Sequence, residues 1–214
     1  MRLVLPRLYV ILDAALLTVP ETECAQKLAD AGVRLLQYRN KSASSRELFE
    51  SSRRLSSQLV PQGVSFLVND RADVASVVDA TGVHVGQEDL SAEAARQVMG
   101  TGKWVGISTH NREQFERAAA TSADYIAVGP VFATSTKANP DPVVGIDFIR
   151  RVRALTTKPI VAIGGITLAR AAEVIGAGAD SIAVVSDVLC APDPGRRARQ
   201  YMDLLEAANH AAAV

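Results

Sequence analysis

Residues 125–137 read Tyr-Ile-Ala-Val-Gly-Pro-Val-Phe-Ala-Thr-Ser-Thr-Lys, a short apolar run joined to a polar loop. The run Tyr125–Val128 has the length and composition of a buried strand. Gly129 and Pro130 end the strand, and the loop that follows offers hydroxyl groups and one lysine. Lys137 carries a mobile point charge suited to phosphate, and the hydroxyls are neutral hydrogen-bond donors. The stretch therefore predicts a strand that ends in an anion-binding loop.

The same pattern recurs along the chain. We expect eight strands, at Leu8–Leu12, Val33–Gln37, Ser65–Val68, Val83–Val85, Trp104–Ile107, Tyr125–Val128, Pro159–Ile163 and Ser181–Val185. Several are apolar throughout, as strands covered on both faces must be. Between them, apolar residues three and four apart predict helices, at Glu21–Ala31, Arg46–Leu59, Asn111–Thr121 and Leu168–Gly176. Ser44 and Ser91 are candidate helix starts, and Ser44 has capping-box spacing to Glu47.

This alternation predicts the fold class. Parallel neighbouring strands need crossover connections, so eight strands alternating with about eight helices predict an all-parallel sheet. Eight such units close into a (β/α)8 TIM barrel, a fold that commonly occupies about 200–250 residues as one domain. We expect residues 1–214 to form a single domain with its active site at the carboxyl ends of the strands. An open doubly wound sheet is less favoured, because Asp13-Ala14-Ala15 follows the first strand in place of a Gly-x-Gly-x-x-Gly motif.

Composition limits the classes of partner. Lys and Arg number 23, and so do Asp and Glu, which argues against a nucleic-acid or anionic membrane surface as the main partner. No run reaches membrane-spanning length, and the first residues lack the apolar core of a signal peptide, so we expect a cytoplasmic protein. Cys24 and Cys190 lack metal-ligand spacing and predict reduced, mostly buried thiols.

The segment after the second expected strand carries three hydrogen-bond donors. Gln37, Arg39 and Lys41 are two residues apart, so in an extended segment their side chains point the same way. Converging amide, guanidinium and ammonium groups predict a phosphate or pyrophosphate clamp. The alternative is an ordinary solvated charged loop.

Carboxylates follow the next two strands. Asp70, preceded by Asn69, follows the third strand and Asp89 follows the fourth. Mg²⁺ takes one or two carboxylates and bridges to substrate phosphate oxygens, so we expect these two aspartates to hold Mg²⁺ opposite the clamp. For Asp70 the alternative is a cap on the next helix. Glu88 is expected at the rim, and His84, inside a strand, as a core histidine with satisfied hydrogen bonds.

The remaining strand ends carry hydroxyls and glycines. Ser108 after the fifth strand could donate to a leaving phosphate or serve as a turn hydroxyl, and His110 could be an acid or base or part of a turn. Gly164 and Gly165 follow the seventh strand and Ser186 the eighth, and these two loops form the recurring phosphate site of this fold. Two anion sites in one barrel mouth predict two phosphorylated substrates or one bisphosphate.

Six motifs, in order along the chain, resemble the thiamine-phosphate synthase family. They are Gln37-x-Arg39-x-Lys41, Asn69-Asp70-Arg71-x-Asp73-x-Ala75, His84-x-Gly86-Gln87-x-Asp89, Gly106-Ile107-Ser108-x-His110, Gly129-Pro130 through Thr134-x-Thr136-Lys137, and Ile163-Gly164-Gly165-Ile166. The resemblance covers residues 8 to 190. It implies an enzyme that joins 4-amino-2-methyl-5-hydroxymethylpyrimidine pyrophosphate to a thiazole phosphate by a dissociative, Mg²⁺-assisted substitution that releases pyrophosphate.

The resemblance also implies a role for each candidate site residue. The pyrophosphate is held by Arg39, Lys41 and Lys137, with Mg²⁺ on Asp70 and Asp89. Ser108 bonds the pyrophosphate as it leaves, and together with Lys137 it is the catalytic candidate. Gln37 and Asn69 border the pyrimidine. The thiazole phosphate site is lined by Thr134, Thr136, Gly165, Val185 and Ser186.

Some positions depart from the family pattern. Tyr38 stands where an aliphatic residue is commoner, Asn40 where an acid is usual, and residues 138–142 replace a more basic continuation. None of them is an expected ligand. We therefore expect the departures to affect the dynamics of the loops and not the chemistry.

Three other functions compete with this interpretation. A thiazole tautomerase would share the region around His110 but needs no metal-assisted clamp. A phosphosugar epimerase or isomerase needs an acid/base pair in the barrel mouth, to which we assign no residues. A non-catalytic phosphate sensor would have no use for the intact carboxylate pair. The sequence does not decide the oligomeric state, because helix faces exposed to solvent cannot be told from helix faces in a subunit interface. A homo-oligomer is compatible with the sequence.

Overall fold

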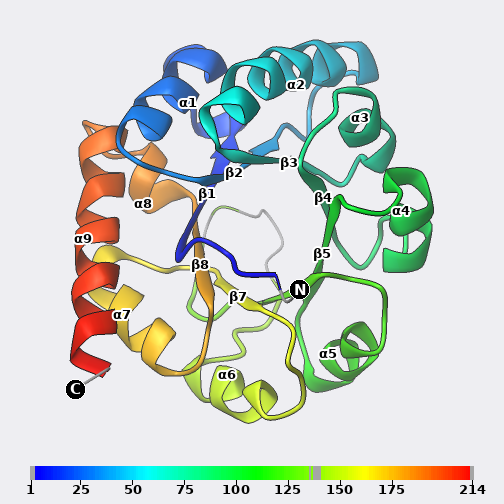
Figure 1. The fold of residues 1–214 in the computed structure, drawn as a ribbon. Helices are drawn as coiled ribbons and strands as arrows, with labels where there is room; N and C mark the ends of the chain where they lie inside the picture. The colour runs from blue at the N-terminus through cyan, green and yellow to red at the C-terminus, as the bar shows by residue number, and fades with distance from the viewer. Residues whose placement is uncertain (1–2, 135, 137–140, 213–214) are drawn as a thin grey trace.

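The computed structural model describes residues 3–134, 136 and 141–212, and its sheet is a closed parallel barrel in sequence order. The strands are β1 Leu8–Asp13, β2 Leu35–Arg39, β3 Ser65–Asn69, β4 Gly82–Val85, β5 Trp104–Thr109, β6 Tyr125–Val128, β7 Ile160–Ile163 and β8 Ser181–Val184. Each of the eight expected strands is present, and β8 pairs with β1 to close the ring. Figure 1 looks into this ring, with the helices outside it. The expected TIM-barrel fold is confirmed.

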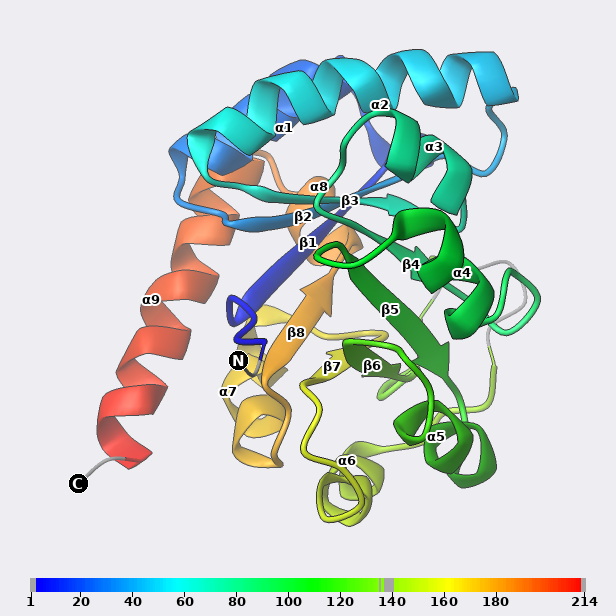
Figure 2. The ribbon, with the colours of Figure 1, turned by 45° about the vertical axis from the view of Figure 1, so that its right-hand side comes forward.

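Helices follow the strands and cover the outside of the barrel. They are α1 Glu21–Asp30, α2 Ser45–Leu59, α3 Ala72–Val77, α4 Ala92–Met99, α5 Arg112–Ala119, α6 Ile146–Arg153, α7 Leu168–Gly176, α8 Ser186–Leu189 and α9 Pro194–Ala212, with short 3-10 turns at Ala14–Leu16 and Val60–Gln62. The last helix, α9, packs against α1, α7 and α8 along one side of the barrel (Figures 1 and 2). The capping box at the start of α2 is confirmed, because Ser44 and Glu47 each accept the other's backbone N–H.

Side chains fill the inside of the ring. Alternate residues of each strand point inward, as the period of two requires. The inward apolar residues form one cluster, which includes Tyr9, Leu35, Leu67, Tyr125 and Val161. The chain ahead of β1 adds buried Leu5 to this cluster at the amino end of the barrel. A second, larger cluster fills the layer between strands and helices.

The amino ends of the strands are held by paired charges. Asp180, just before β8, accepts from the backbone N–H of Ile160 (2.8 Å) and from Arg153 Nη1 (2.6 Å). Asp124, just before β6, forms the equivalent ion pair with Arg96. Paired charges at the entry to a barrel strand contribute to stability and leave the carboxyl ends of the strands for the site.

Two expectations about local structure need correction, and the alternative role of Asp70 as a helix cap is excluded. β2 begins and ends two residues later than expected, so Arg39 as well as Gln37 lies within the strand. Cys24 is buried as expected, but Cys190 is exposed, because it ends the four-residue helix α8 on the outer surface. Asp70 does not cap α3, since its side chain points to Lys41 and the helix begins without a side-chain cap.

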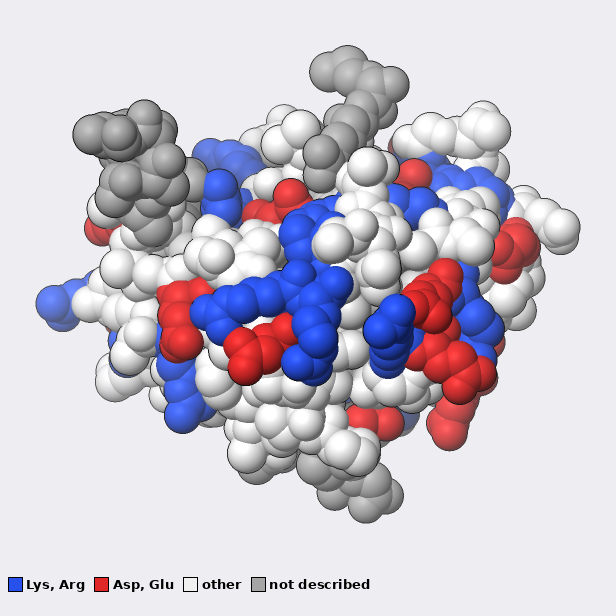
Figure 3. Space-filling view, turned by 90° about the horizontal axis from the view of Figure 1, so that it is seen from below, with Lys and Arg blue, Asp and Glu red and all other residues white. Residues whose placement is uncertain are grey.

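The molecular surface carries both signs of charge. On the face shown in Figure 3, Lys and Arg side chains lie among Asp and Glu side chains. Several of the charges on α5 and α6 are paired one helical turn apart, as in Arg112–Glu116, Arg117–Glu113 and Arg150–Asp147. Within the described part of the chain, no helix combines the length and the apolar character needed to cross a bilayer.

Candidate active site

The donor cluster of β2 lies at the carboxyl end of the barrel, which we call the mouth. Gln37 is 1% exposed, and its Nε2 donates to Tyr9 Oη (2.6 Å) inside the ring. Arg39, one pleat further toward the mouth, donates from Nη1 to Asp13 Oδ2 at the end of β1 (2.5 Å). Asp13 is 2% exposed and also accepts from the Ala15 N–H. The guanidinium is thus held over the mouth by a buried carboxylate that the sequence did not single out.

The two expected metal ligands face each other across neighbouring strand ends. Asp70 has a left-handed backbone (φ +64°) and ion-pairs with Lys41. Burial raises the pKa of Asp70, Lys41 opposes this, and the neighbouring Asp89 carboxylate raises it further. Asp89 Oδ2 accepts from the Gly86 N–H (2.8 Å), which fixes the loop after β4. The protein therefore holds two mutually repelling carboxylates close together at the mouth.

That pair fits Mg²⁺. Mg²⁺ is bound through one or two carboxylates and fills its other positions with water and phosphate oxygens. Among the residues that the structure describes, no cluster of three or more His, Cys, Asp or Glu side chains could enclose a metal ion. A cation on Asp70 and Asp89 would consequently keep open positions for a phosphorylated substrate, and Lys41 stands beside the pair. Glu88 is exposed, as expected for a rim residue.

Ser108 lies within β5 and is therefore not a turn hydroxyl. Its Oγ is 2.8 Å from His84 Nε2, and its carbonyl accepts from Gln87 Nε2 (2.6 Å). His84 is 8% exposed and has a second partner, Tyr125 Oη, at 2.9 Å from Nδ1. Both ring nitrogens are satisfied, which confirms the expected core histidine. Burial lowers the pKa of His84 to about 4, so the imidazole is neutral at physiological pH.

His110 joins two strand ends. Its Nδ1 lies 2.7 Å from the Gly129 carbonyl, which can only accept, so Nδ1 carries the proton. Its Nε2 lies 3.5 Å from Asp141 in the long connection between β6 and α6. These contacts give His110 a structural role in tying the end of β5 to that connection.

The loops after β6 and β7 form the other side of the mouth. The Val131 N–H donates to Ile163 O (2.8 Å) and the Phe132 N–H to Gly164 O (3.0 Å). At Gly165, where φ is +62°, a β-carbon would lie 2.3 Å from the Ala133 carbonyl oxygen, so no larger residue fits without moving a loop. Glycine is required here by both its backbone conformation and this close approach.

Hydroxyl groups gather on this side. Thr134 Oγ1 lies 3.3 Å from Thr136 Oγ1 and also accepts from the Thr136 N–H (3.3 Å). Val185 is half-buried at the end of β8, and exposed Ser186 begins the short helix α8. Loops after strands seven and eight with a short extra helix are the usual phosphate site of TIM barrels. Lys137, expected to reach the pyrophosphate, lies outside the described residues.

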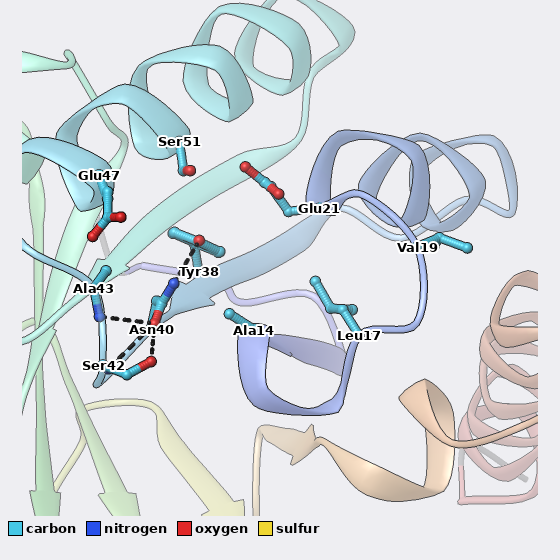
Figure 4. Close-up of a pocket in the computed structure, with 10 residues that line it drawn as sticks. All are labelled: Ala14, Leu17, Val19, Glu21, Tyr38, Asn40, Ser42, Ala43, Glu47 and Ser51. Carbon is cyan, nitrogen blue, oxygen red and sulfur yellow. Dashed lines mark hydrogen bonds between the residues drawn. The ribbon is translucent and has the colours of Figure 1, made fainter.

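The two residues that depart from the family pattern contact each other. Asn40 Nδ2 donates to Tyr38 Oη (3.3 Å), and Asn40 Oδ1 accepts from Ser42 N (3.3 Å), Ser42 Oγ (3.1 Å) and Ala43 N (3.1 Å). Figure 4 shows this turn beside a cavity of about 440 Å³ outside the barrel, between the start of α1 and α2. None of the expected ligands lines that cavity. The turn instead shapes the loop that carries Lys41.

We expect Asn40→Ala to loosen this loop. The substitution removes an acceptor of three hydrogen bonds, and we expect it to lower the free energy of unfolding by about 1 kcal/mol. Isothermal titration with inorganic pyrophosphate and Mg²⁺ should show binding weakened about tenfold, equivalent to ~1.4 kcal/mol, because Lys41 is less well placed. Asn40→Asp keeps the acceptor oxygen and is the matched control. Unchanged affinity of Asn40→Ala for pyrophosphate would show that the Asn40 turn does not position Lys41 for anion binding.

The fold is that of a TIM barrel, and its mouth gathers Arg39, Lys41 and two neighbouring carboxylates. The model of the family described as thiamine monophosphate synthase matches residues 8–188. A thiamine-phosphate synthase of Koribacter versatilis is 51% identical over 208 residues (94% of this chain, 96% of the relative), and one of Chloroflexus aurantiacus is 44% identical over 200 residues (93% and 92%). The solved thiamine phosphate pyrophosphorylase of Pyrococcus furiosus superposes with a TM-score of 0.85 at 34% identity (94% and 96%). The chain belongs to the thiamine monophosphate synthase family, a family of transferases.

Proposed function

We propose that this enzyme condenses 4-amino-2-methyl-5-hydroxymethylpyrimidine pyrophosphate with a thiazole phosphate to give thiamine phosphate and pyrophosphate. The observation that carries the proposal is the pairing of Asp70 with Asp89 beside Lys41, with Arg39 one strand away. Two close carboxylates beside cations suit a metal-bound pyrophosphate. The family membership supports the same reaction.

The chemistry asks the protein to stabilise a leaving group. The bond from the pyrimidine methylene carbon to the pyrophosphate oxygen breaks, and charge gathers on that oxygen. Arg39 and Lys41 are proposed to hold this anion, and Ser108 to donate a hydrogen bond to it. Bound Mg²⁺, held by Asp70 and Asp89, would neutralise part of the same charge. Lys137 is proposed as a further cation for the pyrophosphate.

The second substrate would enter from the opposite side. Thr134, Thr136 and the backbone N–H groups at Gly165 and Ser186 are proposed to hold the thiazole phosphate, with Val185 against the ring. The thiazole nitrogen then forms the new C–N bond to the methylene cation. No nucleophilic side chain is required, and Gln37 and Asn69 are proposed to border the pyrimidine. The long connection between β6 and α6 is proposed to exclude water from the cation.

The direct test supplies the purified protein with both substrates and Mg²⁺ and follows thiamine phosphate by chromatography. We expect product to form, EDTA to stop its formation, and added Mg²⁺ to restore it. Conversion of a thiazole carboxylate isomer without condensation would favour a tautomerase. Condensation that continues undiminished in EDTA would remove Mg²⁺ from the proposal.

We propose that the enzyme works in the cytoplasm on these two small substrates, without a nucleic-acid or membrane partner. The balanced charge of the chain, 23 basic and 23 acidic residues, supports this, because the chain has no net positive charge to attract a polyanion. Light scattering, which measures molar mass in solution, would show whether copies of the chain associate.

A further inference from the structure

A line of buried hydrogen bonds crosses the barrel directly beneath the mouth. It begins at Gln37, whose Nε2 donates to Tyr9 Oη (2.6 Å), and continues to Tyr125 Oη at 3.3 Å from Tyr9 Oη. Tyr125 Oη lies 2.9 Å from His84 Nδ1, and His84 Nε2 lies 2.8 Å from Ser108 Oγ. We call these five residues, from β1, β2, β4, β5 and β6, the polar chain.

The rings of the polar chain are held by packing. The His84 ring stacks on the Tyr125 ring (centroids 5.5 Å apart, planes at 25°), and the Tyr9 ring meets Tyr125 edge-on (6.3 Å, 81°). Gly106 makes room for this stack, because a β-carbon there would lie 2.0 Å from Tyr125 Cζ. The side chains therefore have little freedom to exchange partners, and the remaining variable is the direction in which the protons point.

The Gln37 end sets that direction. An amide NH₂ group can only donate, so Tyr9 Oη accepts there and its own proton is available to Tyr125. Burial raises the pKa of both tyrosines, so each keeps a proton to pass along the line. Tyr125 then donates to His84 Nδ1. Because Nδ1 then accepts a hydrogen bond, it carries no proton, and the ring proton is on the other nitrogen, Nε2.

We propose that the polar chain fixes His84 as the Nε2–H tautomer, so that His84 donates to Ser108 Oγ and Ser108 directs its own proton into the mouth. An Oγ that already accepts from below has its hydroxyl proton free to donate above. Ser108 is thereby set as a donor to the leaving group before substrate binds. His84 and Tyr125 are positioning residues that act through Ser108. The identity of the leaving group rests on the proposed function, whereas the tautomer does not.

The tautomer is measured directly by NMR. In protein labelled with ¹⁵N-histidine, the long-range ¹H–¹⁵N spectrum distinguishes a protonated ring nitrogen from an unprotonated one. His84→Gln identifies the His84 signals among those of the three histidines. We expect a protonated Nε2 and an unprotonated Nδ1 at neutral pH without substrate. The opposite tautomer would mean that Ser108 donates to His84, and would overturn the proposal whatever the enzyme catalyses.

Kinetics test the consequence. Tyr125→Phe keeps the ring but removes the donor to His84 Nδ1, so we expect mixed tautomers and a kcat lowered about tenfold with KM little changed. In a Ser108→Ala background the same substitution should cost nothing more, since its effect passes through Ser108. Equal losses in both backgrounds would assign Tyr125 a purely structural role. Thr109→Val is the matched control: it removes another buried β5 hydroxyl, one bonded to Ala127 O outside the polar chain.

Two substitutions at His84 add a rescue test. His84→Gln places an amide that can donate to Ser108, whereas His84→Leu cannot, so we expect the leucine variant to lose about tenfold more kcat than the glutamine variant. Equal losses in two folded variants would contradict the positioning role. If the wild-type enzyme makes no thiamine phosphate, the proposed function fails, and the NMR result still decides the tautomer.

Discussion

Asp89→Asn should lower kcat/KM for condensation roughly 10²–10³-fold, the scale seen when one stabilising group for developing charge is removed. The asparagine oxygen can still accept from the Gly86 N–H, so the loop after β4 keeps its anchor. What is lost is the negative charge that we propose for Mg²⁺. The loss should be partly reversed at high Mg²⁺ concentration, because the weakened site then fills.

The thermal stability of Asp89→Asn distinguishes a loss of metal binding from misfolding. Asp70 and Asp89 repel each other in the metal-free protein, so neutralising Asp89 should leave the melting temperature unchanged or raise it. Glu88→Gln is the matched control, since it removes a neighbouring exposed charge at the rim and should retain full activity. Steady-state kinetics over a Mg²⁺ series and thermal unfolding are the measurements. Wild-type activity in Asp89→Asn would remove this residue from the metal site.

Arg39→Ala should have the second large effect, on stability as well as on activity. It leaves the Asp13 carboxylate, which is 2% exposed, without its cation. Breaking such a pair costs about 3–5 kcal/mol, and the partial exposure of Arg39 favours the lower end, about 3 kcal/mol. For a domain of this size, this corresponds to a melting temperature about 6–12 °C lower.

A second substitution separates the two roles of Arg39. In Arg39→Ala with Asp13→Asn the uncompensated charge is gone, and the asparagine can still accept from the Ala15 N–H. We expect the double variant to recover most of the stability. The loss of pyrophosphate from the pyrimidine substrate should stay as slow as in Arg39→Ala. Recovery of activity together with stability would show that Arg39 serves the fold alone.

The sequence was sufficient for the fold and for the outline of the mouth. Short apolar runs and their helical connections have strong periodicities, so β6 and α7 match their expected bounds. β2 was misplaced by two residues because Val33 joins Leu35 and Leu36 in one apolar pattern, while barrel closure sets where pairing begins. The register of a strand depends on its pairing with neighbouring strands, so the sequence of one strand alone does not determine it.

The contacts beneath the mouth could not be predicted in the same way. Asp13 follows an apolar strand like any turn residue, and only the barrel brings it to Arg39, 26 residues away. Tyr9 and Tyr125 read as ordinary core aromatics, yet their hydroxyls are joined across 116 residues. Such pairs depend on which strand positions share a layer inside the ring. Period-two alternation indicates that these side chains face into the barrel, but it does not indicate which side chains they contact there.

A crystal structure with Mg²⁺, pyrophosphate and thiamine phosphate would show whether the mouth holds two anions in separate places. We expect pyrophosphate against Arg39 and Lys41, with Mg²⁺ bound by Asp70 and Asp89. We expect the phosphate of thiamine phosphate at Thr134, Gly165 and Ser186. Pyrophosphate bound at the β7 and β8 loops, or Mg²⁺ bound away from both aspartates, would contradict this arrangement.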